Sequence, residues 1–161
     1  MARINCDPYE GGHLFVLVNR VTCLFDTEAE AMSSVRALEE AGVLTEDIDV
    51  FVGELGAQCL DLSGRGHGRA VRLLRSIEDA VSDMGETSQR IDEALRRGES
   101  LVCVKLHKRP LLDHDAEGRV HVVLFERQND EKNRALGVLK ALHAHEIHYW
   151  GAWSVEDVPS S

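Results

Sequence analysis

Aromatic residues, prolines and basic residues are scarce in this chain of 161 residues, which holds two Trp, two Tyr, four Phe and three Pro. No run of about eighteen apolar residues is present, so the sequence predicts no membrane-spanning helix, and its first residues lack the apolar run of a secretory signal. Eighteen basic residues stand against twenty-eight acidic ones, which gives a net charge of −10. This excess of negative charge argues against a general affinity for nucleic acid or anionic lipid. We expect a cytoplasmic protein with neither nucleic acid nor a membrane as partner.

The four cysteines contain no C-x-x-C pair, so the sequence encodes neither a zinc ribbon nor a thioredoxin-type redox site. Cys23 and Cys103 lie in apolar runs, where a thiol behaves as a small hydrophobic side chain, and we expect both to be buried and inert. Hydrophobic residues make up 43% of the chain and charged residues 29%, as in globular domains. A chain of this length can bury a core as one domain without disulfides.

The first third of the chain is predicted to form a strand, a helix and a second strand. Residues 14–25 are rich in Val, Leu and Phe and predict extended structure, and residues 48–52 predict the next strand. Between them, Thr27 and Glu30 have the spacing of a capping box, and Gly42 supplies a helix end. Apolar residues at helical spacing mark the buried side of this helix: Ala31, Val35, Leu38 and Ala41.

Residues 54–98 are predicted to be an insertion that begins as an irregular, glycine-rich loop and continues as two helices. A clear strand follows at residues 101–106. Residues 113–118 predict a turn, and residues 120–125 predict a further strand that pairs with residues 101–106 as a hairpin. A last helix and a strand at residues 145–153 complete the chain.

Residues 21–53 and residues 120–151 form a weak internal repeat, because both have the pattern of strand, capped helix and strand. Two βαβ halves in series predict an α+β, ferredoxin-like fold with an antiparallel sheet, helices on one of its faces, two extra helices and an extra hairpin strand. Residues 1–161 then form one ferredoxin-like domain, in which the strands at residues 21–25 and 48–52 lie side by side. A flavodoxin-like α/β layer is the alternative, but its parallel strands would be more uniformly apolar.

Four segments carry a resemblance to a known family. They are Phe25-Asp26 ahead of an Ala- and Glu-rich helix, Leu60-Asp61-Leu62-Ser63-Gly64 with His67-Gly68, Ala94-Leu95-Arg96-Arg97-Gly98 ahead of an apolar strand, and His145 with Tyr149-Trp150-Gly151-Ala152-Trp153. In this order they resemble the bacterial general stress protein 17M-like proteins over most of the chain. The resemblance implies a small ferredoxin-like domain without an established activity, and it implies no catalytic residue.

Residues 64–75 form the most distinctive segment, in which glycines and basic side chains concentrate in an otherwise acidic chain. Exposed backbone amides, a helix N-terminus and Arg side chains are groups that bind phosphate or carboxylate. The residues of this predicted anion site are Gly64, Arg65, Gly66, His67, Gly68, Arg69 and Arg72. The alternative is a solvated or ion-paired helix face. The spacing matches neither the dinucleotide fingerprint nor a Walker loop.

Three histidines, His143, His145 and His148, lie close together and offer ligands for zinc or copper. On a strand, His143 and His145 share a face and His148 points to the other. A metal site would therefore need further ligands from elsewhere in the chain, and hydrogen-bonded or exposed histidines are the alternative. The sequence predicts no cofactor.

Tyr149, Trp150 and Trp153 gather near the C-terminal end of the chain. On one strand Tyr149 and Trp153 share a face and Trp150 takes the other, so one aromatic face packs on helices and the other is available to a second subunit. We therefore expect a homodimer that uses the open face of the sheet. Plain core packing of these aromatic side chains is the alternative.

Three hypotheses of function remain open. The first is a stress-associated, non-enzymatic binding or oligomeric protein. The second is a protein that binds or acts on a small phosphorylated or carboxylated anion at residues 64–75, with Arg69 and Arg72 as donors and His67 as acid or base. The third is a metal-binding protein that uses His143 and His145.

Overall fold

The computed structural model describes residues 3–4, 17, 19–60, 84–107, 111–114, 120–123, 126–151 and 155–159. Its main sheet consists of β1 (Arg3–Ile4), β2 (Arg20–Phe25), β3 (Ile48–Val52), β4 (Ser100–Lys105), β7 (His145–Trp150) and β8 (Val155–Val158). Helices α1 (Glu28–Glu40), α2 (Gly53–Leu60), α4 (Met84–Arg96) and α5 (Glu126–Ala141) pack on this sheet, and a 3₁₀ turn, η1 (Thr45–Asp47), precedes β3. The architecture is α+β.

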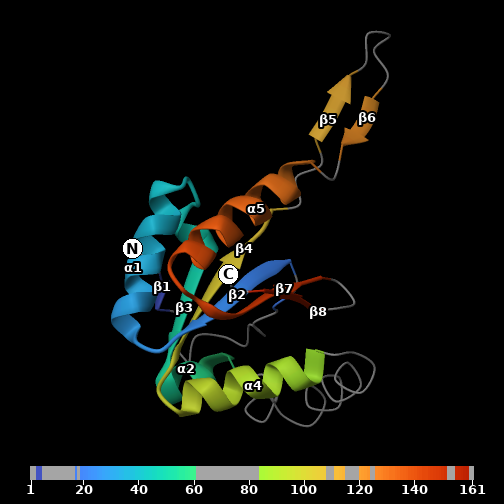
Figure 1. Ribbon diagram of the computed structural model, residues 1–161. Helices are drawn as coiled ribbons and strands as arrows, with labels where there is room; N and C mark the ends of the chain where they lie inside the picture. The colour runs from blue at the N-terminus through green and yellow to red at the C-terminus, as the bar shows by residue number, and fades with distance from the viewer. Residues whose placement is uncertain are drawn as a thin grey trace.

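The strands of the main sheet follow the order β1-β3-β4-β2-β7-β8 (Figure 1). The five strands from β3 to β8 are antiparallel to their neighbours, and β1 joins β3 in parallel. The expectation that residues 21–25 and 48–52 lie side by side is wrong, because β4 lies between β2 and β3 and pairs with both. Pairing with a strand that is distant in the sequence depends on packing in the sheet, which local patterns do not encode.

Helix α1 confirms the prediction made from its capping residues. The Thr27 hydroxyl accepts a 3.2 Å hydrogen bond from the Glu30 amide, and the Glu30 carboxylate accepts a 3.1 Å bond from the Thr27 amide. The helix buries Ala31, Val35 and Leu38, as its spacing predicts. Just past the end of the helix, Gly42 has a φ of +89°, a conformation that favours glycine.

Helices cover both faces of the main sheet (Figure 1). On one face, α1 and α5 pack on a core cluster that includes Val21 and Val102. On the other face, α2 and α4 pack on a cluster that includes Phe51 and Leu101. The expectation of helices on one face and an open second face is therefore wrong, because α2 and α4 occupy that second face. No helix among the described residues is long and apolar enough to span a membrane.

Helix α2 occupies residues that the sequence predicts to be irregular. It begins at Gly53, which has a φ of +56° and whose amide donates a 3.0 Å hydrogen bond to the carbonyl of Glu99. A Cβ at Gly56 would lie 2.8 Å from the carbonyl carbon of Phe51, so this glycine allows the helix to lie directly against β3. Helix α4 confirms a helix ahead of β4, while residues 61–83 lie outside the described part of the chain.

A separate hairpin is formed by β5 (Leu111–His114) and β6 (Val120–Val123), and it projects beyond the N-terminal end of α5 (Figure 1). The prediction that residues 120–125 pair with residues 101–106 is wrong, because β4 uses its two edges to pair with β2 and β3. The second strand, helix and strand unit of the main sheet is thus β4, α5 and β7. The hairpin is inserted between β4 and α5.

The C-terminal strand predicted at residues 145–153 ends earlier, since β7 stops at Trp150 and β8 pairs antiparallel beside it. Two central thiols, Cys23 and Cys103, are free and buried, as predicted from their apolar surroundings. Burial raises the pKa of both thiols, which keeps them protonated and poorly nucleophilic.

Candidate functional site

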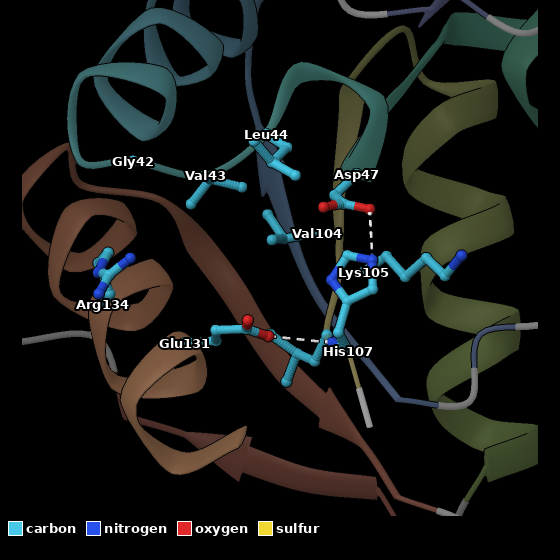
Figure 2. A pocket seen from close by; sticks show the side chains of 10 residues that line it. Gly42, Val43, Leu44, Asp47, Val104, Lys105, His107, Glu131 and Arg134 are labelled. Atoms are coloured by element: carbon cyan, nitrogen blue, oxygen red, sulfur yellow. Dashed lines mark hydrogen bonds and ion pairs between the residues drawn. The ribbon is translucent and has the colours of Figure 1, made fainter. Parts of the chain in front are cut away.

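A pocket of about 230 Å³ lies between the α1–β3 connection, the C-terminal end of β4 and helix α5 (Figure 2). Its apolar walls are Val43, Leu44, Val104 and Leu106. Its polar lining consists of Asp47, Lys105, His107, Glu131 and Arg134. The pocket therefore combines an apolar surface with ionisable groups from three parts of the chain.

Asp47 reaches the pocket because η1 turns the chain between α1 and β3. The Asp47 amide donates a 2.9 Å hydrogen bond to the carbonyl of Leu44, which closes this turn. The side chain of Asp47 is only 6% exposed. A carboxylate this deeply buried needs a polar partner to offset the loss of hydration.

His107 supplies that partner from the end of β4. Its Nε2 lies 3.2 Å from Oδ1 of Asp47. Its backbone amide donates a 3.0 Å hydrogen bond to Oε2 of Glu131 on α5. Just before it, the Leu106 amide donates a 2.9 Å bond to the carbonyl of Asn19, which fixes the chain as it leaves β4. His107 thus joins the η1 turn to helix α5 (Figure 2).

Burial is the largest influence on Asp47 and raises the pKa of its carboxyl. His107 and then Lys105 act in the opposite direction and lower this pKa, because positive charge favours the carboxylate. Glu46 and Glu131 raise the pKa again through repulsion. The net shift is upward, so burial outweighs the ion pair.

Both acidic residues of the pocket contact His107. The two strongly basic residues of the pocket, Lys105 and Arg134, make no comparable contact with another described residue. Within the described part of the chain, no ion pair or hydrogen bond involves the side chain of Lys105 or Arg134. The Lys105 ammonium points away from the centre of the pocket (Figure 2). The guanidinium of Arg134 lies over Gly42, where a Cβ would come within 3.6 Å of its Nη1. Because Lys105 points away, Arg134 is the cation among the described lining residues that borders the pocket without an ion pair or hydrogen bond.

The predicted anion site at residues 64–75 lies outside the described residues, and so does Trp153. Trp150 is buried, with 3% exposure, and its indole Nε1 donates a 2.8 Å hydrogen bond to Oγ1 of Thr22. Trp150 therefore packs in the core, which was the alternative for the aromatic group Tyr149, Trp150 and Trp153, because α2 and α4 cover that face of the sheet. Tyr149 is half-buried, and the Lys132 ammonium lies 4.0 Å from the centre of its ring.

The three clustered histidines occupy three different environments. His143 is exposed in the turn after α5. His145 faces Asp26 and Glu99, with its Nε2 at 3.2 and 3.6 Å from their nearest carboxylate oxygens. His148 is buried between the carboxylates of Asp157, at 2.8 Å, and Glu146, at 3.1 Å. The histidines therefore do not converge on one metal ion.

Sequence reasoning missed every polar residue of the pocket described above. Asp47, His107 and Glu131 are far apart in the sequence, and none belongs to a short motif. The only local signal is the acidic turn ahead of β3, which is common in proteins without a pocket.

Comparisons of the chain with protein-family models, with curated proteins and with solved structures returned no match.

Proposed function

We propose that the protein is a non-enzymatic binding protein whose ligand is a small molecule carrying a carboxylate or phosphate group. The ligand occupies the pocket beside Asp47, His107 and Arg134. The single observation that carries this proposal is the Arg134 guanidinium, which has no ion pair or hydrogen bond among the described residues and borders a partly apolar pocket whose acidic groups have a partner in His107.

The size of the pocket limits the ligand. A volume of about 230 Å³ is smaller than the roughly 300–1,000 Å³ typical of sites for drug-sized ligands and cofactors. The apolar walls favour a short hydrocarbon body, such as that of an aliphatic carboxylic acid or a small phosphate ester.

The charge of the pocket determines the polar group of the ligand. A guanidinium donates two parallel hydrogen bonds to a carboxylate or phosphate, and such charge-assisted bonds are stronger than neutral ones. Asp47 and Glu131 already have a partner in His107, Asp47 at the imidazole Nε2 and Glu131 at the backbone amide. Arg134 then acts as the anchor in a chain whose net charge is −10.

Binding is preferred over catalysis because of the groups that line the cavity. Among the described lining residues, none carries a hydroxyl or thiol nucleophile. The Asp47–His107 pair has a structural role: it forms a polar wall of the pocket and holds the η1 turn against β4.

The test is calorimetric titration with inorganic phosphate, short aliphatic carboxylates and a small phosphate monoester. At least one of these should bind the wild type, and Arg134→Gln should weaken that binding by about tenfold or more, as expected for the loss of a charged hydrogen bond. Arg36→Gln is the matched control, because Arg36 is exposed on α1 and does not line the pocket. Equal binding by wild type and Arg134→Gln would refute the proposal.

We also propose that the centre of the sheet is a ferredoxin-like unit to which further strands have been added. Two features support this proposal. The strands β3, β4, β2 and β7 alternate in direction, and each of the pairs β2/β3 and β4/β7 is linked through a helix, α1 or α5. The six-stranded sheet differs from a plain ferredoxin-like sheet by the edge strands β1 and β8.

We further propose that the protein is stress-associated and that it forms a homodimer. The resemblance to the general stress protein 17M-like proteins supports the first. The homodimer would form through an edge of the sheet, because β8 is the last strand in the order and can pair with a second copy of the chain. Light scattering at several protein concentrations tests the dimer, and a mass of one chain at every concentration would exclude it.

A further inference from the structure

Three ligand-type side chains meet at one end of neighbouring strands of the main sheet. Asp26 directly follows β2, Glu99 directly precedes β4, and His145 opens β7. Strand β2 lies between β4 and β7, with Phe25 paired to Ser100 and Leu24 paired to His145. The antiparallel register therefore brings these three residues together from distant parts of the chain.

A β-bulge sits beside His145. Between β2 and β7 the register passes from Thr22↔His148 to Leu24↔His145, so β7 carries one more residue than β2 over this step. Glu146 in the bulge has a φ of +48°, which is strained for a residue other than glycine. Bulges of this kind redirect side chains and are enriched beside functional sites.

The ligand atoms of this cluster are close together but poorly satisfied. Nε2 of His145 lies 3.2 Å from Oδ1 of Asp26 and 3.6 Å from Oε2 of Glu99. Nε2 of His145 and Oε2 of Glu99 are both buried, and neither has a hydrogen-bond partner. Both atoms take part in ion pairs, but buried polar atoms rarely lack a hydrogen bond, so these two are placed to share a ligand.

We propose that Asp26, Glu99 and His145 bind a divalent transition-metal ion of the zinc type. Their three ligand atoms lie within 4.8 Å of one another. Tetrahedral zinc, with bonds of about 2.0–2.2 Å, separates its ligand atoms by roughly 3.4 Å. The two distances from His145, 3.2 and 3.6 Å, fall on either side of this value, and the Asp26 and Glu99 oxygens lie within 4.8 Å of each other, so side-chain movements alone would bring the three ligands to one ion.

The donor set selects the class of ion. Two carboxylates and one neutral imidazole carry a total charge that balances a divalent cation. Calcium and magnesium prefer oxygen ligands alone, whereas an imidazole nitrogen favours zinc and its transition-metal neighbours. Three protein ligands leave a fourth position for water, the arrangement that catalytic zinc sites have.

Arg97 supports the orientation of Glu99. Its Nε and Nη2 donate hydrogen bonds of 3.2 and 2.9 Å to Oε1 of Glu99. This pairing leaves Oε2 facing His145. Outer-shell contacts that orient a metal ligand in this way commonly tune metal affinity.

The experiment is a calorimetric titration of the metal-free full chain with Zn²⁺, repeated with Co²⁺ while its visible absorption is recorded. One ion should bind per chain, and the cobalt spectrum should be that of a tetrahedral site. Asp26→Asn removes one carboxylate ligand. The Asp26 side chain is 82% exposed, so the substitution should not affect folding. Asp26→Asn and Glu99→Gln should each weaken binding by more than the roughly 10–100-fold that loss of an outer-shell partner costs.

His143→Asn is the matched control, because His143 is exposed, lies two residues before His145, and has a φ of +58° that Asn tolerates. This variant should bind zinc as the wild type does. A wild type that binds no zinc, or an Asp26→Asn variant that binds it unchanged, would overturn the proposal. The outcome does not depend on the anion pocket, so the two proposals fail separately.

Discussion

The two ends of strand β4 carry the same residue types but different chemistry. Beyond its C-terminal end, His107 holds Asp47 and Glu131, and the charge left unpaired at the pocket belongs to Arg134. At its N-terminal end, Oε2 of Glu99 lacks a hydrogen-bond partner and faces Nε2 of His145. One end therefore attracts an anion, and the other attracts a cation.

The difference teaches that the groups left unpaired, rather than the residues present, determine what each site binds. At the pocket, the His107 imidazole faces one carboxylate, that of Asp47 at 3.2 Å, and the backbone amide of His107 binds Glu131. At the other end, the His145 imidazole faces two carboxylates, at 3.2 Å from Asp26 and 3.6 Å from Glu99. There, Oε2 of Glu99 and Nε2 of His145 are buried without a hydrogen bond.

The largest expected effects come from titrating a variant of each site with both ligands, zinc and the anion. Glu99→Gln should lose zinc binding by more than about tenfold and keep anion binding, and Arg134→Gln should do the reverse. Calorimetry with each ligand on both variants measures the four affinities. If either substitution weakened both ligands equally, the two sites would not be independent.

A second test perturbs the sheet that both sites share. Gly56→Ala places a Cβ 2.8 Å from the carbonyl carbon of Phe51, which pairs with Leu101 of β4. We expect a loss of about 1–3 kcal/mol in the free energy of unfolding, measured by urea denaturation.

Gly137→Ala is the control for this substitution, since a Cβ at Gly137 in α5 meets no atom within 4 Å. It should stabilise the protein by roughly 0.5–1 kcal/mol, because alanine is the better helix former. Equal effects of the two alanines would show that the α2–β3 contact is not tight.

The smallest expected effect concerns the pH dependence of the unfolding free energy, to which Asp47 in the pocket contributes. Burial, the main cause, raises the pKa of Asp47 above its ordinary value of 3.8. The folded state therefore holds the Asp47 proton more tightly than the unfolded state, and this stabilisation, present below pH 3.8, is lost as the pH rises through the folded-state pKa.

Asp47→Asn removes this proton and serves as the reference. Between about pH 4 and 5.5, below the usual range of histidine titration, the unfolding free energy of the wild type should fall relative to that of Asp47→Asn. Parallel pH profiles for the two proteins would contradict the raised pKa.

Local signals predicted the parts of the fold that depend on neighbours in the sequence. The capping box of Thr27 and Glu30 and the apolar spacing of Ala31, Val35 and Leu38 predicted α1 correctly. Residues 48–52 and 101–106 are apolar enough to predict β3 and β4. The same approach failed at α2, because the two glycines at its start suggested a loop. The structure uses Gly56 for close contact with Phe51 instead.

Neither site could be predicted from spacing in the sequence. His107 meets Asp47 only because β4 pairs with β3, and Glu99 meets His145 only because β4 and β7 lie on either side of β2. The metal-site hypothesis drawn from the sequence included His145, which also belongs to the cluster proposed above, but its other histidine, His143, lies exposed in the turn after α5. The sequence around Trp150 did not indicate that α2 and α4 would cover its face of the sheet.

The sequence by itself determined the helices and strands whose signals are local, because capping and apolar periodicity act over a few residues. It also determined the excess of acidic over basic residues. In so acidic a chain, an arginine such as Arg134 that contacts no acid among the described residues points to an anionic ligand. Tertiary structure decided the order of the strands, the burial of Trp150 and the meeting of the residues at both ends of β4. These features depend on contacts between segments far apart in the chain, whose energies appear only when the sheet is assembled.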